Sequence, residues 1–282
     1  MSALYEIVPN ISEGRDAGVV DACVGAVGAA GARVIDRTSD ETHHRSVITA
    51  VGTRAAVLDA SVALAGAAAG RIDLRRHRGA HPRIGALDVL PFVALKDATL
   101  EDAASLAREA GARIWETHRI PSYFYGAAAS AEHRRLLADV RRGEFEGLTA
   151  RIQDPGWKPD VGDGAHASAG AIAIGARPIL IAFNIELESG DLGLALELAR
   201  RLRERTGGLR TLRALGLRRG EIVQLSFNIT DVEATPIYRI VELVRSLAGE
   251  RGVALRRSEL IGLVPRRALQ RTAAYYRGDD DS

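Results

Sequence analysis

One segment of the chain combines a turn, a cluster of basic side chains and an apolar run: Arg76-His77-Arg78-Gly79-Ala80-His81-Pro82-Arg83-Ile84-Gly85-Ala86-Leu87-Asp88-Val89-Leu90-Pro91-Phe92. Two glycines and a proline interrupt its first half, which rules out a continuous helix through the histidines. The apolar residues 86–95 that follow predict a buried strand. Because proline cannot donate to a sheet ladder, Pro91 favours an edge strand or a bulge. The segment therefore predicts a rigid basic loop that leads into a sheet.

The two histidines make this loop a candidate site. An imidazole titrates near neutral pH and suits proton transfer, and the neighbouring arginines favour an anionic substrate. His77 and His81 also have the i, i+4 spacing of metal ligands on a helix, but the glycine and proline around them break such a helix, so no metal is expected. The alternative for each histidine is an ordinary hydrogen-bonding role in a solvated loop.

Composition limits the classes of protein to which the chain can belong. Its 282 residues include 38 basic and 36 acidic side chains, a balance that gives no general attraction to nucleic acid. Cys23 is the only cysteine, which favours a reducing compartment and excludes a disulfide within the chain. The sequence lacks the pattern of a signal peptide and any apolar run of the ~18 residues that a membrane span needs. These features predict a cytoplasmic protein with no membrane partner.

The periodicity on either side of the basic loop predicts two α+β halves. In the first, strands are expected at residues 4–8, 33–36, 46–51 and 121–125, and helices at 16–29, 54–71, 100–117, 131–141 and 144–151. A long loop at 153–170, rich in glycine, precedes a second cycle. Strands are expected there at 171–174, 179–185, 209–215, 222–229 and 253–256, and helices at 191–205, 235–250 and 265–276. Both halves thus predict an antiparallel-rich sheet with helices on one face, in the manner of the β-α-β-β-α-β unit.

A second candidate site is the polar run Asp36-Arg37-Thr38-Ser39-Asp40-Glu41-Thr42-His43-His44-Arg45, which joins two predicted strands. Its composition allows an Asp–His pair, or recognition of a substrate carboxylate by Arg45. The alternative is a solvated hairpin tip. A zinc site at Asp40, His43 and His44 is disfavoured, because adjacent residues of a strand point to opposite faces.

Three asparagines follow apolar strands: Asn10, Asn184 and Asn228. Three strand ends of this kind would present three amides to one cavity, which makes these residues candidate substrate ligands. Asparagine also favours the turns at strand ends for local reasons, and that alternative stays open.

The order of short motifs along nearly the whole chain resembles the glutamate formiminotransferase family, which includes the formimidoyltransferase half of formiminotransferase-cyclodeaminase and stand-alone bacterial forms. The most specific motif is His81-Pro82-Arg83-Ile84-Gly85-Ala86-Leu87-Asp88. Others are Val8-Pro9-Asn10-Ile11-Ser12-Glu13-Gly14, Tyr123-Phe124-Tyr125-Gly126, Arg142-Gly143-Glu144-Phe145-Glu146-Gly147-Leu148, Trp157-Lys158-Pro159-Asp160 and Ser258-Glu259-Leu260-Ile261-Gly262.

This resemblance implies an N-subdomain over residues 1–177 and a C-subdomain over 178–282. Both would be ferredoxin-like α/β sandwiches enclosing a folate tunnel, in a homodimer. The implied reaction moves the formimino group of N-formimino-L-glutamate to N5 of tetrahydrofolate, the co-substrate, in histidine degradation and one-carbon metabolism. His81 takes the position of the family's catalytic histidine. The implied folate-binding stretch consists of Gly162, Asp163, Gly164, Ala165, His166, Ala167, Ser168, Ala169 and Gly170.

Other roles follow as hypotheses from the same resemblance. One imidazole, His81, can accept the N5 proton and return it to the departing amine. Asp40 and Arg83 are predicted to belong to the catalytic group with His81. Asp40, or alternatively Asp36, would bind the amidinium or steady His81, and Arg45 and Arg83 would bind the glutamate carboxylates. His44 stands where the family commonly has Asn, and it is a further candidate substrate ligand.

Departures from the family pattern leave other functions open. The stretch 162–170 is one residue short and lacks the aromatic residues of mammalian members, and Ala80 replaces a commonly acidic residue. One alternative is a formyltransferase that uses 5-formyltetrahydrofolate and glutamate. Another is a folate-binding homologue without catalysis.

Overall fold

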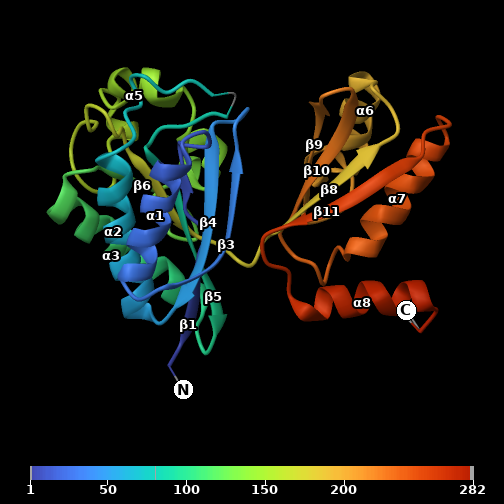
Figure 1. Cartoon of the computed structure of the whole chain (residues 1–282), viewed down its shortest axis with the longest axis horizontal. Coiled ribbons are helices and arrows are strands. Elements are labelled where there is room, and N and C mark those ends of the chain that lie inside the picture. The colour runs from blue at the N-terminus through green and yellow to red at the C-terminus, as the bar shows by residue number, and fades with distance from the viewer. Residues whose placement is uncertain (1, 80, 280–282) are drawn as a thin grey trace. The chain divides into compact units, whose positions relative to one another are not determined.

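A computed structural model describes residues 2–79 and 81–279. Internal contacts divide the chain into two compact units, Met1–Pro178 and Ile179–Ser282, drawn in Figure 1. Each unit has its own sheet and its own apolar core. Among the helices of the described residues, none combines the length and the apolar character needed to cross a membrane.

The N-terminal unit contains a seven-stranded mixed sheet. Strand order is β1-β4-β2-β5-β7-β6, with β3 paired to β4 and β1 paired also to β5. The pairings β5–β7 and β6–β7 are parallel, and the others are antiparallel. The strands are β1 (Leu4–Ile7), β2 (Asn10–Ile11), β3 (Arg33–Asp40), β4 (Arg45–Gly52), β5 (Leu87–Lys96), β6 (Ser122–Gly126) and β7 (Ile172–Ala176).

Three helices pack on one face of this sheet: α1 (Ala17–Ala29), α2 (Arg54–Ala69) and α3 (Leu100–His118). Each begins at a residue whose side chain accepts hydrogen bonds from the first turn, namely Asp16, Thr53 and Thr99. Their small apolar residues and the inward side of the strands form the main core. The short helices α4 (Leu137–Val140) and α5 (Glu144–Arg151) contribute Val140 and Leu148 to a separate cluster with strands β5, β6 and β7.

Strand β5 occupies an internal position in the sheet, so the edge-strand alternative is wrong, while its pairings with β1 and β2 do contain register shifts. It pairs with β1 and β2 on one side and with β7 on the other. Val8, in the break between β1 and β2, donates its N–H to Pro91 O at 3.3 Å. The carbonyl and the nitrogen of a strand residue face the same neighbour, so the Pro91 nitrogen also faces this break. Pro91 is therefore tolerated inside the sheet. The missing N–H thus falls where the neighbouring strand is interrupted.

Two other segments differ from the sequence prediction. The polar run before Arg45 is half strand, because β3 continues to Asp40 and pairs with β4 up to Asp40↔Arg45. The helix expected at 131–141 is reduced to a 3₁₀ turn, Glu132–Arg134, and to α4. The interruption lies at Leu136, whose backbone is extended, and the buried guanidinium of nearby Arg134 donates to the carbonyls of Gly156 and Lys158.

The C-terminal unit has the element order β-α-β-β-α-β followed by a helix. Its four-stranded sheet is antiparallel throughout, in the order β11-β8-β10-β9. The elements are β8 (Ile181–Leu187), α6 (Leu192–Leu202), β9 (Leu212–Arg219), β10 (Ile222–Ile229), α7 (Ile237–Gly249), β11 (Leu255–Ile261) and α8 (Arg266–Arg277), with a 3₁₀ turn at Glu204–Thr206. β10 has the predicted bounds, whereas β11 begins two residues later and continues to Ile261.

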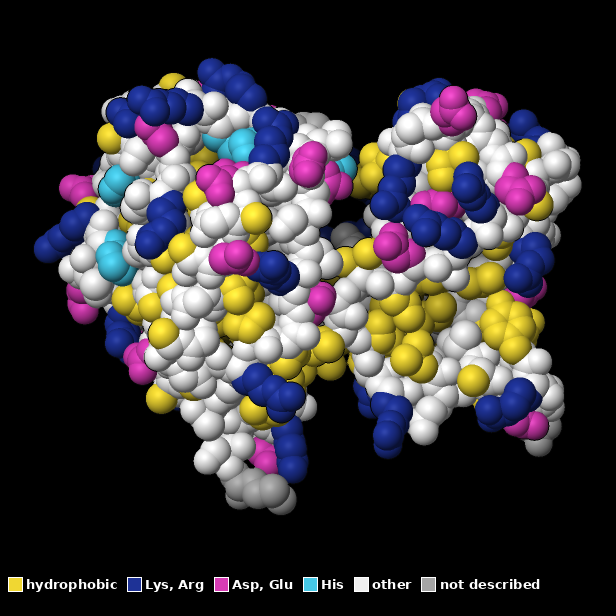
Figure 2. Space-filling view, in the orientation of Figure 1, with side chains coloured by type: hydrophobic (Ala, Val, Ile, Leu, Met, Phe, Trp, Pro, Cys, Tyr) yellow, Lys and Arg dark blue, Asp and Glu magenta, His cyan; other side chains and the backbone are white. Residues whose placement is uncertain are grey.

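The inner side of this second sheet carries Phe183 and Phe227, whose ring centroids lie 6.2 Å apart, and α6 and α7 pack against it. Its other side carries polar residues, with Glu186 accepting hydrogen bonds from Arg257 and Arg219. Figure 2 shows basic and acidic side chains interspersed over both units, in keeping with the nearly balanced charge.

Candidate active site around His81

The basic loop between α2 and β5 is fixed by backbone hydrogen bonds to the segment 162–171. Leu74 N donates to Ser168 O at 2.9 Å, and Ala86 N donates to Ala169 O at 3.0 Å. Ala171 N in turn donates to the carbonyl of the buried Ile84 at 3.0 Å. The predicted folate segment thus packs against the basic loop and is hydrogen-bonded to its backbone. Ala80 lies outside the described residues.

The hydrogen bonds of His81 assign the position of its ring proton. Nδ1 lies 2.7 Å from Pro82 O, an atom that can only accept, so Nδ1 carries the hydrogen. Nη1 of Arg45, which can only donate, lies 2.5 Å from Nε2 and 2.7 Å from Nδ1; with the hydrogen on Nδ1, the ring accepts through Nε2. The imidazole is therefore neutral, and Nε2 is its basic atom.

The surroundings of His81 keep it unprotonated. Burial, followed by the positive charges of Arg45 and Arg141, lowers the pKa of His81 to about 3, while Pro82 O and Asp88 act in the opposite direction. Burial and the charge of Arg141 also lower the pKa of Arg45 to about 9, so its guanidinium remains charged at neutral pH. The arrangement pairs a neutral base with a cation in direct contact.

Arg45 begins β4, and its guanidinium donates to a residue of the neighbouring strand β2. Its Nη2 donates to Oδ1 of Asn10 on β2, and Asn10 Nδ2 donates to Val8 O at 2.7 Å. The strand register explains this meeting, because Asn10 pairs with Val47 of β4 and with Val89 of β5. Two residues that the sequence singled out separately, Asn10 and Arg45, therefore lie together beside His81.

Asp88 and Arg141 complete this group and were not predicted as site residues. Asp88 is 2% exposed; its Oδ1 accepts from Ile84 N at 2.8 Å and its Oδ2 accepts from Arg141 Nη2 at 2.5 Å. The same Oδ2 lies 3.9 Å from Arg45 Nη1. A carboxylate in an otherwise apolar strand was the available signal for Asp88. We call Asn10, Arg45, His81, Asp88 and Arg141 the His81 cluster.

Arg83 belongs to a different group of side chains. Its Nε donates to His77 Nδ1 at 3.1 Å, and its Nη1 and Nη2 atoms donate to Glu144 and Glu146 at 2.7–2.9 Å. The side-chain partners of Arg83 thus are His77, Glu144 and Glu146 rather than His81. We call His44, His77, Arg83, Glu144 and Glu146 the Arg83 cluster. It borders a cavity of about 450 Å³ lined by Arg78, Gly79, Arg83, Gly143, Glu144 and Glu146.

His44 links this second cluster to the turn after β2. Its ring stacks on that of His77, with centroids 4.2 Å apart. Its Nε2 lies 2.9 Å from Glu13 Oε1, and its Nδ1 lies 3.0 Å from Arg78 O. Burial opposes ionisation of Glu13, but hydrogen bonds from the backbone of Asp16 and Arg15 and the neighbouring His44 outweigh it and lower the pKa of Glu13. His44 therefore fixes the basic loop to the rest of the unit.

Asp40 lies at the end of β3 opposite Arg45, but its carboxylate turns to His43. Oδ1 accepts from His43 N at 2.7 Å and lies 3.1 Å from His43 Nδ1. Burial raises the pKa of Asp40, and the hydrogen bonds from His43 exceed that effect and lower it overall. The His43 ring meets the His81 ring edge-on, with centroids 6.2 Å apart. Among the described residues, no group of three His, Cys, Asp or Glu side chains is arranged to hold a metal ion.

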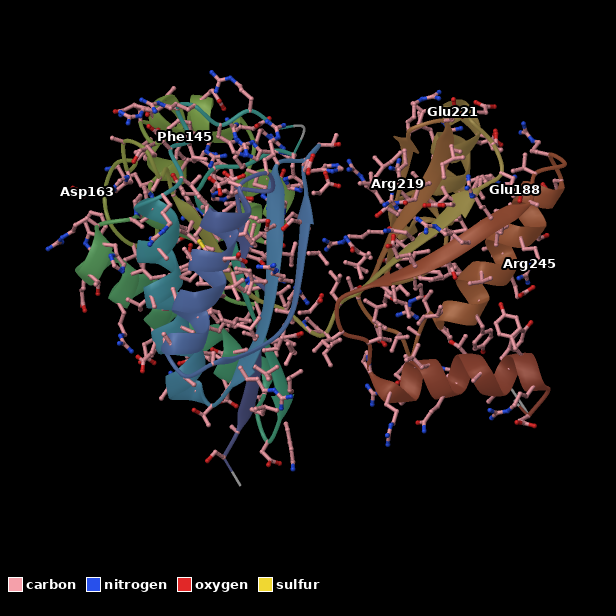
Figure 3. All side chains as sticks on the ribbon, viewed as in Figure 1. Phe145, Asp163, Glu188, Arg219, Glu221 and Arg245 are labelled. Carbon is pink, nitrogen blue, oxygen red and sulfur yellow. The ribbon has the colours of Figure 1, made fainter. Side chains whose placement is uncertain are left out.

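The segment 162–170 is shaped by glycines. At Gly170, φ is +69° and an added Cβ would lie 2.0 Å from Ile84 O; at Gly162, φ is +84° and a Cβ would lie 2.5 Å from the ring of Trp115. Between them, His166 and Gly170 exchange two backbone hydrogen bonds, and His166 Nδ1 accepts from Ala169 N at 3.1 Å. Figure 3 labels Asp163 in this segment and Phe145 on α5.

The two remaining predicted ligands lie in the sheet of the C-terminal unit. Asn184 is in the middle of β8, where it pairs with Ser226 and Glu259, so its expected place at a strand end is wrong. Asn228 is the penultimate residue of β10 and pairs with Ala182 and Arg213. Both side chains lie on the polar side of that sheet.

Comparisons with known proteins agree over nearly the whole chain. Residues 4–177 match the family model of the N-terminal subdomain of the formiminotransferase domain, and residues 182–282 match that of the formiminotransferase domain. The glutamate formimidoyltransferase of Thermoplasma acidophilum is 42% identical over 97% of this chain and 92% of its own length. The enzyme of the same name from Streptococcus pyogenes is 37% identical over 98% and 94%.

A two-activity relative matches over a smaller share of its length. The formimidoyltransferase-cyclodeaminase of Rattus norvegicus is 35% identical over 98% of this chain, which spans 53% of that protein. All of these matches cover the formiminotransferase domain. The chain belongs to the formiminotransferase family.

Proposed function

We propose that this protein is a glutamate formimidoyltransferase, which moves the formimino group of N-formimino-L-glutamate to N5 of tetrahydrofolate. The proposal is supported by relatives of that name at 37–42% identity over nearly the full chain. The structural observation that carries it is the neutral imidazole of His81, with an unprotonated Nε2 in contact with Arg45. A positioned base of this kind can carry the proton between two amines, and a neighbouring guanidinium can bind a substrate carboxylate.

His81 would move one proton from the attacking amine to the leaving amine. A new bond forms between N5 and the amidine carbon, and the bond from that carbon to the glutamate nitrogen breaks. Nε2 takes the proton that N5 loses and gives it to the departing glutamate nitrogen, so the imidazole ends as it began. The low pKa of His81 keeps the imidazole unprotonated at neutral pH, and it also makes Nε2 a weaker base than an ordinary imidazole. The same low pKa makes the imidazolium a strong acid for the second half.

The other predicted site residues would either bind the substrate or position the basic loop. Arg45 and Asn10 would bind the amino-acid portion of the substrate, because both reach the His81 ring or its partner. Asp40 would bind the cationic amidinium, with His43 as its present partner. Arg83 and His44 would act as positioning residues, since their contacts hold the basic loop. Asn184 and Asn228 remain proposed substrate ligands on the C-terminal unit.

The co-substrate and the architecture complete the proposal. Tetrahydrofolate would bind at residues 162–170, whose backbone packs on the histidine loop. Both units would be ferredoxin-like subdomains, with the boundary after residue 177, and the folate tunnel and the homodimer stay predictions from the resemblance. The strand order β11-β8-β10-β9 with a β-α-β-β-α-β sequence supports this for the C-terminal unit. A place in histidine degradation and a cytoplasmic location also stay predictions.

Incubation of the purified protein with tetrahydrofolate and N-formimino-L-glutamate tests the proposed function. Acidification converts the transferred group to a methenyl bridge on the folate, and its absorbance reports the product. We expect product with formiminoglutamate as donor and none when either substrate is omitted. Product only from 5-formyltetrahydrofolate and glutamate would favour the formyltransferase. Folate binding without either product would favour a homologue that has lost catalysis.

A further inference from the structure

Arg141 carries a buried hydrogen-bond donor without an acceptor. It follows α4, its side chain is 10% exposed, and its Nη2 donates to Asp88. Its Nε is buried and, within the described part of the chain, meets no hydrogen-bond partner. An unsatisfied buried donor is unfavourable by ~1–3 kcal/mol. This position therefore favours a ligand that supplies an acceptor.

The charges of the His81 cluster point to the chemistry of that ligand. Arg45 and Arg141 bring two positive charges, and His81 is neutral. Among the described residues, Asp88 is the only carboxylate within 4.0 Å of either guanidinium. The cluster thus has an excess positive charge in a largely buried place. Such an excess is stabilised by an anion that accepts from both guanidiniums.

We propose that Arg141 is a substrate-binding residue, which together with Arg45 binds one carboxylate of the amino-acid portion of the substrate beside His81. Asp88 would fix the pair, because its Oδ2 contacts Arg141 at 2.5 Å and lies 3.9 Å from Arg45, while its Oδ1 is bound to Ile84 N. That the bound amino acid is formiminoglutamate rests on the proposed function. That the bound group is a carboxylate rests on the residues of the His81 cluster alone.

Binding of a carboxylate would also prepare the base. In the present arrangement Arg45 Nη1 donates to His81 Nε2 at 2.5 Å. A carboxylate held between the two guanidiniums competes for that donor, because an anion is the stronger acceptor. The lone pair of His81 is then released toward the attacking amine. The same pair of arginines thus links recognition of the amino acid to the availability of the base.

Isothermal titration calorimetry with glutarate, L-glutamate and glutaramide tests the pair without requiring turnover. Glutaramide has the length of glutarate but no charge. We expect glutarate and L-glutamate to bind the wild-type protein and glutaramide to bind much more weakly. In Arg141→Gln, glutarate affinity should fall roughly 10- to 100-fold, as expected for loss of hydrogen bonds to a charged group. Arg142→Gln is the matched control, since Arg142 is 76% exposed and pairs with Asp139.

Arg141→Lys keeps a positive charge beside Asp88, and it provides the test if Arg141→Gln fails to fold. A lysine cannot form the planar two-donor contact, so glutarate should bind at least about five-fold more weakly than to the wild type. The proposed carboxylate site would be overturned if either folded variant bound glutarate with wild-type affinity. It would also be overturned if the wild-type protein bound glutaramide as tightly as glutarate. Failure of the proposed function looks different: a wild-type protein that binds glutarate through Arg141 but transfers no formimino group.

Discussion

Nη1 of Arg45 lies 2.5 Å from Nε2 of His81, and the two residues come from positions 36 apart in the chain. The contact joins the first residue of β4 to the loop before β5. Its consequence is electrostatic: a fixed cation beside the ring disfavours the imidazolium and leaves the base free. Asn10 of the neighbouring strand β2 accepts a hydrogen bond from this guanidinium, and Oδ2 of Asp88 on β5 lies 3.9 Å from it.

Replacement of His81 should remove catalysis while leaving the fold intact. In His81→Gln we expect kcat to fall about 10²- to 10⁴-fold, the contribution of a general acid–base group. Single-turnover formation of the methenyl product measures this step. His133→Gln is the control, because its ring contacts the Gly156 carbonyl, Arg134 and Trp157, none of which belongs to the His81 cluster. A His81→Gln protein with near-normal turnover would remove this residue from the mechanism.

Replacement of Arg45 should change both affinity and pH dependence. Arg45→Gln loses a donor to the substrate carboxylate, so KM for formiminoglutamate should rise at least about ten-fold. It also removes a charge that lowers the pKa of His81, so the acid limb of kcat/KM should move upward toward 6.5, the ordinary value. Rates measured from pH 4 to 8 separate the two effects. An acid limb that stays in place would show that Arg45 does not control the base.

Folding stability should depend on pH through His81. Its pKa is about 3 in the folded protein and 6.5 in an ordinary environment, so the unfolded chain binds a proton that the folded protein does not between those values. The free energy of unfolding should therefore fall as pH decreases from about 6.5 to 3, and His81→Gln should show a smaller fall. Urea unfolding at several pH values measures it. Equal slopes for both proteins would contradict the low pKa.

Gly170 should be intolerant of a side chain. In Gly170→Ala the added Cβ would lie 2.0 Å from Ile84 O at a positive φ, so we expect a loss of stability of more than about 2 kcal/mol. Gly28→Ala is the control, since a Cβ there meets nothing within 4 Å and the residue lies in α1, where alanine gains roughly 0.5–1 kcal/mol. Thermal unfolding of both variants shows whether stability falls in Gly170→Ala and rises in Gly28→Ala. A stable Gly170→Ala protein would mean that the segment 162–170 is packed differently.

Arg83 should matter for structure more than for chemistry. Its guanidinium is 7% exposed and joins the basic loop to Glu144 and Glu146, so Arg83→Gln should lower the free energy of unfolding by roughly 1–3 kcal/mol. At a temperature where the variant is folded, kcat should stay within about ten-fold of the wild-type value. A kcat loss as large as that of His81→Gln, with unchanged stability, would return Arg83 to the catalytic group.

Sequence reasoning located the elements and part of the site. The basic loop, the buried strand after it and β10 were predicted from glycine, proline and apolar periodicity, which are local signals. Arg45, His81 and Asn10 were singled out one by one. Their meeting depends on the register of β2, β4 and β5, and no local pattern encodes that register.

The parts that sequence reasoning missed depend on contacts between distant segments. Asp88 and Arg141 are 53 positions apart, and their pairing could not be read from either neighbourhood. The internal place of β5 was missed because the break in the neighbouring strand opposite Pro91 is a property of pairing. The helix expected at 131–141 is interrupted at Leu136, next to a segment in which Arg134 makes hydrogen bonds to the distant residues Gly156 and Lys158.

The central claim is that His81 is a neutral base at physiological pH, with its proton on Nδ1 and its lone pair on Nε2. Nitrogen-15 NMR of the histidine rings measures this directly, with His81→Gln used to assign the signal. We predict the Nδ1–H form across pH 5–8 and proton uptake only near pH 3. Titration of the His81 ring near pH 6.5, or a proton on Nε2 in the neutral form, would contradict the account.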